Sequence, residues 1–266
     1  MDDFFTGRDA LIGLAVKYRG DWNQIYAGMR LKEKIEPAEL KALLSTVKCK
    51  TLTVLDAEYP DEFRKSCRQP PFVLFYYGDI SLMWDYRKIL TIVGSRSPSD
   101  YAAKKARELA GGIADHGYIV ASGLARGIDT CVGEATAGMP GKSIAILGCG
   151  IEETYPPENL ELRKRIAKTG LLLSEYPGTT PPSARNFPMR NRILAAISYG
   201  TFIAEAGEQS GTLITAAFAT EYNRDLAALP FRCDEGLANN RLIKGGAALV
   251  ESVNDLDLFM SCATLT

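Results

Sequence analysis

The segment RNFPMRNR, from Arg185 to Arg192, carries three arginines and no acidic residue. The guanidinium group of arginine matches the geometry of a phosphate and can form paired hydrogen bonds with it. A helix is predicted over residues 188–198, and cations near its N-terminus oppose the helix dipole unless an anion binds there. The segment therefore predicts an anion site, and a solvated basic helix start is the alternative. The residues expected to take part are Arg185, Asn186, Phe187, Arg190, Asn191 and Arg192.

Three other loops have the composition of anion sites at helix starts. Glycine allows a ligand to approach the backbone closely, and the free amide groups of a helix start attract phosphate. The loops contain, in chain order, Gly94, Ser95 and Arg96; Ser122, Gly123, Arg126 and Gly127; and Ser210, Gly211 and Thr212. Each loop alone would fit a tight turn between a strand and a helix. Three such loops, two of them with an arginine, favour a shared ligand.

The helix after the first loop is predicted to begin at Ser97 and Pro98. Serine is a favoured N-cap and proline is favoured at the first helical position. Phe187 is expected just ahead of its helix, where it fits either a hydrophobic staple or a platform for a stacked base. Arg190 and Arg192 lie two positions apart, so they cannot share one helical face and one of them can be structural.

An alternation of strands and helices from about Thr51 onward predicts the scaffold that positions these loops. Short apolar runs are typical of strands that helices cover on both faces of a parallel sheet. Strands are expected at 72–77, 89–93, 118–121, 143–147, 171–174, 201–204 and 226–229. The pattern indicates an α/β fold, with an extended Rossmann-like, doubly wound and mainly parallel sheet over residues 51–266. The three loops should then meet at one edge of this sheet.

Residues 1–50 differ from the rest and are typical of short amphipathic helices, expected at 10–18, 21–31 and 36–47. Asp21 is a plausible N-cap and Pro37 fits a first helical turn. This part predicts a small helical, SAM-like N-terminal domain. The first residues lack the basic and apolar regions of a signal peptide, and no apolar run is long enough for a membrane span.

The overall composition limits the function. The chain has 266 residues with 31 basic and 32 acidic side chains, so any affinity for nucleic acid must come from a local cluster. Its six cysteines lack metal-ligand spacing and are typical of reduced thiols in a cytoplasmic protein. The single histidine, His116, lies between a helix and a strand, where a loop or cap role is expected. We expect no metal and no cofactor.

The glycine loops do not match the common nucleotide motifs. The first loop reads Gly94-Ser95-Arg96 rather than G-x-G-x-x-G, and no GxxxxGK[ST] occurs, so ATP hydrolysis is not expected. A basic, glycine-lined edge with Phe187 at its rim suits a sugar-phosphate backbone with unstacked bases. The residues therefore favour a single-stranded nucleic acid as the ligand.

At these residues the sequence resembles the DNA processing protein A (DprA/Smf) family. The resemblance runs from YPDEF, near residue 59, to about Leu256, through TIVGSRSPS, IVASGLARGID, AILGCGIEETYPPEN, LLLSEYP, FPMRNRILAAIS, EAGEQSGTLITAAFA and NNRLIKGGA. It implies a protein without catalytic activity that binds single-stranded DNA in natural transformation and recombination. It also implies that the protein displaces single-strand-binding protein, loads RecA and forms a homodimer.

The resemblance also implies DNA-binding roles for individual residues. It implicates Arg96 and the basic segment that leads into the predicted helix, although Ala184 and Arg185 stand where some relatives have a lysine. Lys244, in the last motif, is included in the expected DNA-binding set. Many members add a C-terminal winged-helix domain, which we do not expect in this chain because it ends at Thr266.

Two other function classes remain open from the sequence. One is a nucleotide-processing enzyme of the related LOG-type phosphoribohydrolase class, whose PGGxGTxxE motif supplies a catalytic acid. The corresponding loop here reads EQSGTLITA, and Glu205 is the leftover acid, for which a role in holding amides or Arg192 is expected. The other is a scaffold that recruits RecA and touches DNA only indirectly.

Overall fold

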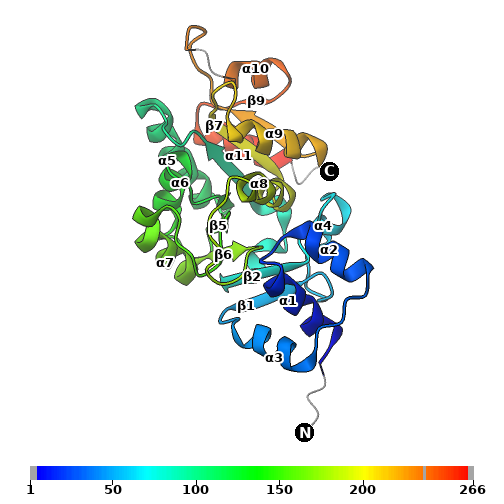
Figure 1. Ribbon diagram of the computed structural model, residues 1–266. Coiled ribbons are helices and arrows are strands. Elements are labelled where there is room, and N and C mark those ends of the chain that lie inside the picture. The colour runs from blue at the N-terminus through cyan, green and yellow to red at the C-terminus, as the bar shows by residue number, and fades with distance from the viewer. Residues whose placement is uncertain (1–4, 236–237, 263–266) are drawn as a thin grey trace.

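The computed structural model describes residues 5–235 and 238–262. Within these ranges the strands form one sheet in the order β1-β2-β6-β5-β4-β3-β7-β8-β9 (Figure 1). The strands are β1 (Lys50–Thr53), β2 (Val73–Gly78), β3 (Ile89–Gly94), β4 (Ile119–Ser122), β5 (Ser143–Leu147), β6 (Leu171–Ser174), β7 (Gly200–Glu205), β8 (Asp225–Ala228) and β9 (Ala248–Leu249).

Most of the sheet is parallel, as predicted. All neighbouring pairs from β6 to β9 are parallel, whereas β2 pairs antiparallel with both β1 and β6. The chain runs outward from β3 through β4, β5 and β6, and then returns to the other side of β3 to form β7. The strand order therefore reverses between β3 and β7, and ligands of open α/β sheets bind at such a switch point.

Helices cover both faces of the sheet. They are α1 (Gly7–Lys17), α2 (Trp22–Arg30), α3 (Pro37–Ser45), α4 (Asp61–Lys65), α5 (Asp100–Asp115), α6 (Ile128–Thr136), α7 (Leu160–Thr169), α8 (Asn186–Ile197), α9 (Gly211–Glu221), α10 (Asn239–Lys244) and α11 (Val253–Ser261). Along β3, Ile89 and Val93 join one apolar core and Leu90 and Ile92 join another. This explains why the strand is a continuous apolar run rather than an alternating one.

Three helix starts differ from the predictions by two or three residues, and the first is that of α1, which begins at Gly7 rather than at residue 10. Helix α5 begins at Asp100 with Ser99 as its N-cap, whose hydroxyl accepts a hydrogen bond from the amide of Ala102, so the prediction of Ser97 and Pro98 was wrong. Helix α8 begins at Asn186, so Phe187 lies in its first turn rather than ahead of it. His116 is the C-cap of α5, which confirms the expected cap role.

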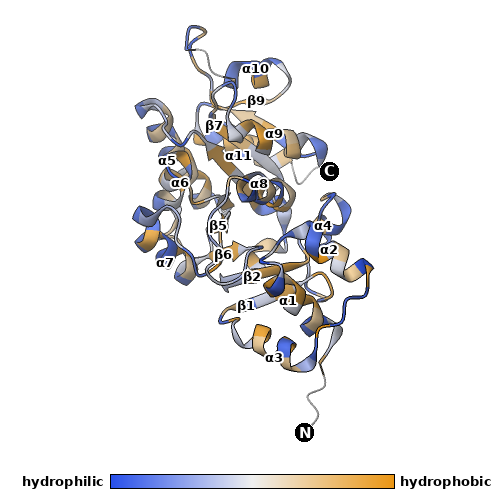
Figure 2. Ribbon diagram, in the orientation of Figure 1, coloured by the Kyte–Doolittle hydropathy of each residue, from blue (hydrophilic) through white to orange (hydrophobic). Residues whose placement is uncertain are grey.

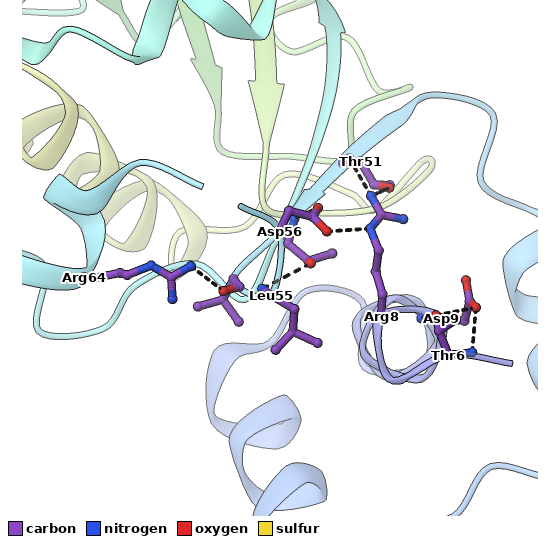
Figure 3. A network of polar contacts seen from close by, with 9 residues as sticks. Thr6, Arg8, Asp9, Thr51, Leu55, Asp56 and Arg64 are labelled. Carbon is purple, nitrogen blue, oxygen red and sulfur yellow. Dashed lines mark hydrogen bonds and ion pairs between the residues drawn. The ribbon is translucent and has the colours of Figure 1, made fainter. Parts of the chain in front are cut away.

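The N-terminal helices α1 to α3 pack beside the antiparallel end of the sheet (Figure 1). Figure 3 shows Arg8 of α1 reaching this end, where its Nε donates to Asp56 Oδ1 at 2.8 Å and its Nη2 to the carbonyl of Thr51 at 2.8 Å. Leu11 and Ile25 also share an apolar cluster with strand β2. The helices are thus fixed against the sheet, and the division into domains at residue 50 stays a prediction.

Strand β6 and the elements around β7 are coloured as hydrophobic, whereas α4 is hydrophilic and α7 is mixed (Figure 2). Among the helices of the described ranges, none combines the length and apolar character that crossing a membrane requires.

Candidate functional site

A cavity of about 740 Å³ opens at the switch point between β3 and β7. Its walls come from the loop after β3, the segment that leads into α8, and the first turns of α8 and α9. The predicted site residues that line it are Gly94, Ser95, Arg96, Phe187, Arg190, Asn191, Ser210, Gly211 and Thr212. The second glycine loop reaches the cavity through Ala125, so all three glycine loops and the basic segment converge, as their placement on parallel strands predicted.

Arg96 and Phe187 meet in the wall of this cavity. The guanidinium carbon of Arg96 lies 4.7 Å from the centroid of the Phe187 ring, and Tyr155 packs on that ring with a centroid distance of 5.6 Å. A Cβ atom at Gly148 would come within 2.7 Å of the ring, so the glycine provides the space that Phe187 occupies. Arg96 is exposed, and within the described ranges no acidic side chain pairs with it. Its charge is therefore available to an anion.

Arg190 lines the cavity as a buried residue with 4% exposure. Its Nη1 donates to the carbonyl of Gly123 at 2.5 Å and to that of Ile146, and its Nε donates to Asn191 Oδ1 at 3.0 Å. Any side chain at Gly123 would collide with this guanidinium. Arg190 therefore joins the ends of β4 and β5 to α8, and the role of Gly123 is to make room for it.

Asp129, in the first turn of α6, contributes the cavity's buried carboxylate. Its Oδ2 accepts a hydrogen bond from the amide of Ala125 at 3.3 Å. Burial raises its pKa, although the nearby charge of Arg190 opposes this shift. Burial also lowers the pKa of Arg190, against the attraction of Asp129. The two groups thus place opposite charges at the inner wall of the cavity.

Arg192, which was included in the expected DNA-binding set, does not line the cavity. It is 1% exposed, its Nη2 donates to Glu175 Oε1 at 2.7 Å, and its Nε donates to the carbonyl of Gln69 at 2.9 Å. Of the two roles expected for Glu205, the structure shows the first: its Oε2 accepts from the amide and the hydroxyl of Ser99 at 3.0 and 2.6 Å, and Arg192 pairs with Glu175 instead. Of the two helical arginines, Arg192 is the structural one.

The other predicted residues lie outside the cavity lining, which does not include Ser122, Gly123, Arg126, Gly127, Arg185, Asn186 or Lys244. The Ser122 hydroxyl is bonded to the carbonyl of Ile92, and Gly127 takes a φ of 78° where any Cβ would meet the backbone of Ser95 and Arg96. Lys244 ends α10, a helix that contacts β7 and β8. Ser122 and Gly127 therefore support the loops beside the cavity without lining it.

Two exposed arginines outside the lining are held in ion pairs. Arg126 Nε lies 2.5 Å from Glu158 Oε1, and Arg185 Nη1 lies 3.3 Å from Asp21 Oδ2. Both arginine side chains are more than half exposed, at 61% and 67%. Such exposed pairs are weak, so a phosphate could compete for either arginine.

Several cavity residues were not singled out from the sequence. They include Asp129, Tyr155, Pro182, Ser183, Ile214 and Thr215. The signal for Asp129 was an acid in the first turn of a helix that follows a glycine loop. No pattern pointed to Tyr155, because it reaches Phe187 from a loop distant in sequence.

Comparisons with known proteins identify the family of the chain. The family model described as DNA recombination-mediator protein A matches residues 50–261. Protein Smf of Synechocystis is 39% identical over 209 residues, which are 77% of this chain and 52% of that protein. DNA processing protein DprA of Bacillus subtilis is 38% identical over 208 residues, which are 77% of this chain and 69% of that protein. The chain thus spans about half the length of the Synechocystis relative.

Two solved structures share the fold. The X-ray structure of DprA from Streptococcus pneumoniae has a TM-score of 0.76 at 30% identity and covers 94% of this chain and 93% of its own. A structure of DprA from Helicobacter pylori, from work on the single-stranded DNA binding mode of that protein, has a TM-score of 0.72 at 30% identity, with coverages of 82% and 97%. Because the family model matches most of the sequence and the fold is shared with two DprA structures, the chain belongs to the DNA recombination-mediator protein A family.

Proposed function

We propose that the chain binds single-stranded DNA in the cavity between β3 and β7. The observation that carries the proposal is the exposed and unpaired Arg96 beside the Phe187 ring, which puts a phosphate-binding cation and an aromatic face at the same point. Nonspecific single-strand sites combine these two features, since guanidinium groups follow the backbone while bases stack on aromatic rings. The relative from Helicobacter pylori is described as binding single-stranded DNA, which supports the same ligand class here.

The proposed contacts follow the cavity wall. Arg96 takes a phosphate together with the free amides at the start of α9, where Ser210 is the N-cap and makes no side-chain cap bond. Phe187 and Asn191 face the same space and are assigned to a base and its sugar. Arg126 and Arg185 join when DNA displaces Glu158 and Asp21. Arg190 supports the inner wall, and Arg192 and Lys244 make no contact.

The test compares single-stranded and duplex oligonucleotides at two salt concentrations, measured by fluorescence anisotropy. We expect the single strand to bind more tightly than the duplex and its affinity to fall as salt rises, because bound phosphates release counterions. Arg96→Ala should weaken single-strand binding by about ten- to a hundredfold, the range of a charge-assisted hydrogen bond. Unchanged affinity in this variant, with an intact fold, would refute the assignment of the cavity.

We further propose that the chain catalyses no reaction on its ligand. Asp129 is the carboxylate in the cavity lining, and it is bonded to a backbone amide and faces Arg190 rather than a second acid. Glycoside-type chemistry requires two groups in acid and base or nucleophile roles. Incubation with nucleoside monophosphates should release no free base, and any release that Asp129→Asn abolishes would instead favour the LOG-type enzyme.

The partners are proposed from family membership. RecA, single-strand-binding protein and a second copy of the chain are the expected partners, in recombination and natural transformation in the cytoplasm. The free state of the six cysteines is compatible with that compartment. Mixing the protein with RecA on oligonucleotides covered by single-strand-binding protein should speed the growth of RecA filaments, and Arg96→Ala should remove this effect. Light scattering of the purified protein should report a dimer.

A further inference from the structure

Three aromatic rings form a parallel cluster outside the cavity. Trp22 lies 5.0 Å from Phe72 with an interplanar angle of 21°, and 5.1 Å from Tyr26 with an angle of 14°. The rings of Tyr26 and Phe72 are also nearly parallel, at 12° and 6.5 Å. We call these three residues the ring cluster. It joins helix α2 to the start of β2.

Packing accounts for only part of the ring cluster. Phe72 is buried, and the indole Nε1 of Trp22 donates to the carbonyl of Pro70 at 2.8 Å, so both anchor the N-terminal helices. Tyr26 is 44% exposed and Met29 is 39% exposed on the same helix. An exposed tyrosine that is already stacked on a tryptophan presents a rigid aromatic surface at little further entropic cost. The exposed Tyr26 ring is thus available to a ligand that stacks on it.

One arginine contacts the ring cluster, and two others lie close to it in the sequence. The guanidinium carbon of Arg30 lies over the Tyr26 ring at 5.9 Å from its centroid. Arg19 precedes α2 and Arg68 precedes Pro70, and both are exposed. Within residues 5–235 and 238–262, neither these two nor Arg30 has an ion-pair partner. The positive charge that Arg30 places at the ring cluster fits an anionic ligand rather than a neutral apolar one.

The ring cluster is connected to the cavity through neighbouring residues. Asp21, next to Trp22, pairs with Arg185, which follows the cavity-lining residues Ser183 and Ala184. On a second route, Arg192 of α8 binds the carbonyl of Gln69, and the next carbonyl, that of Pro70, binds Trp22. A single-stranded nucleic acid that leaves the cavity beside Arg185 therefore reaches the ring cluster next.

We propose that Tyr26 and Arg30, backed by Trp22, form a second contact for single-stranded nucleic acid that extends the path out of the cavity. The proposal rests on the proposed function of the cavity. A base stacks on the exposed part of the Tyr26 ring, and the guanidinium groups of Arg30 and Arg185 bind the adjacent phosphates. Duplex DNA cannot make this contact, because its bases are already stacked.

The test uses oligo-dT of two lengths, about 6 nucleotides to fill the cavity alone and about 20 to reach the ring cluster. Tyr26→Ala should weaken binding of the long oligonucleotide by about five- to a hundredfold, the effect of losing one stacked base, and leave the short one unchanged. Tyr26→Phe should retain the affinity of the wild type for both, since the ring is kept. Arg30→Ala should lower the salt dependence of long-oligonucleotide binding by about 0.7, the slope of one phosphate contact on a single strand.

Trp22 supplies an independent signal because the chain has 2 tryptophans. In a Trp84→Phe protein, whose remaining tryptophan is Trp22, the long oligonucleotide should quench the indole emission and the short one should not.

The outcomes separate this proposal from the proposed function. If Arg96→Ala weakens both lengths while Tyr26→Ala changes neither, the second contact is overturned and the cavity assignment stands. If Arg96→Ala changes neither length, the cavity assignment fails and the second contact fails with it. If Tyr26→Ala leaves both affinities unchanged but alters sedimentation of the protein without DNA, the ring cluster serves a second copy of the chain, and the proposal is overturned. Equal weakening at both lengths also overturns it, because the effect would then act through the fold.

Discussion

The guanidinium carbon of Arg96 lies 4.7 Å from the centroid of the Phe187 ring. The contact joins the loop after β3 to the first turn of α8, two segments far apart in the sequence. A cation over an aromatic face is held by the ring quadrupole, which orients Arg96 without neutralising it. An ion pair would have occupied the guanidinium, whereas this contact leaves its hydrogen-bond donors free for phosphate.

The first prediction concerns the Phe187 ring. Phe187→Leu keeps an apolar side chain beside Gly148 but removes the aromatic face, so single-strand affinity should fall by about five- to a hundredfold. Phe187→Tyr should bind like the wild type, because the ring and its contact with Arg96 persist. Anisotropy titrations measure both, with thermal melting as the check on folding. If Phe187→Leu retains full affinity, the ring only fills the cavity wall.

The second prediction concerns the charge of Arg96. Arg96→Ala should lower the slope of log affinity against log salt by about 0.7, the value for one phosphate contact on a single strand. The matched control is Arg87→Ala, because Arg87 precedes β3 and so lies at the opposite edge of the sheet, with its guanidinium over the Tyr86 ring at 5.8 Å. The control should leave both affinity and slope unchanged. An equal change in the two variants would indicate a diffuse effect of net charge.

The fold was predictable where burial dictates the local pattern. The strands expected at 143–147 and 171–174 match β5 and β6, because both are short apolar runs with every residue buried. Helix α7 was not predicted, because its sequence LELRKRIAKT is mostly polar and only Leu162 and Ile166 are buried in the fold. The start of α5 was misplaced by two residues because Ser97 and Ser99 both flank Pro98. Glu205, from the end of β7, binds Ser99 and distinguishes the two.

The site was predictable as a set of loops but not residue by residue. Helical spacing indicated that Arg190 and Arg192 face different surroundings, and it gave no means to tell which one faces the ligand. The bonding partners of the two arginines determine which one faces the cavity. Arg192 is buried in an ion pair with Glu175, whereas Arg190 donates to the carbonyls of Gly123 and Ile146 at the cavity wall. These partners come from other strands and loops, so no local pattern contains them.

The third prediction concerns the buried pair of Arg192 and Glu175. Arg192→Met leaves the carboxylate of Glu175 buried without a partner, which should lower the free energy of unfolding by about 3–5 kcal/mol. Adding Glu175→Gln removes that charge and should recover part of the loss. Urea unfolding measures the stability of both variants.

The same variants test the exclusion of Arg192 from the DNA site. The folded fraction of the Arg192→Met protein should bind single-stranded DNA with the affinity of the wild type, because Arg192 does not line the cavity. A variant of normal stability that has lost binding would contradict this assignment and return Arg192 to the DNA-binding set.

The fourth prediction concerns the pH dependence of binding. Burial raises the pKa of Asp129 above its usual value of 3.8, so this carboxyl takes up a proton at a higher pH than an exposed aspartate does. The charged form repels phosphate in the cavity and the protonated form does not. Single-strand affinity should therefore rise as the pH falls from neutrality toward the raised pKa.

Asp129→Asn has no charge in this range, and its amide oxygen can still accept the hydrogen bond from Ala125. This variant should bind on the order of threefold to tenfold more tightly at pH 7, as expected for removing one screened like charge, and should show a flatter pH profile. Anisotropy titrations across this range measure the effect, with Asp115→Asn as the control, because Asp115 is exposed at the end of α5 away from the cavity. If Asp129→Asn and the wild type follow the same pH profile, Asp129 does not face the bound phosphates.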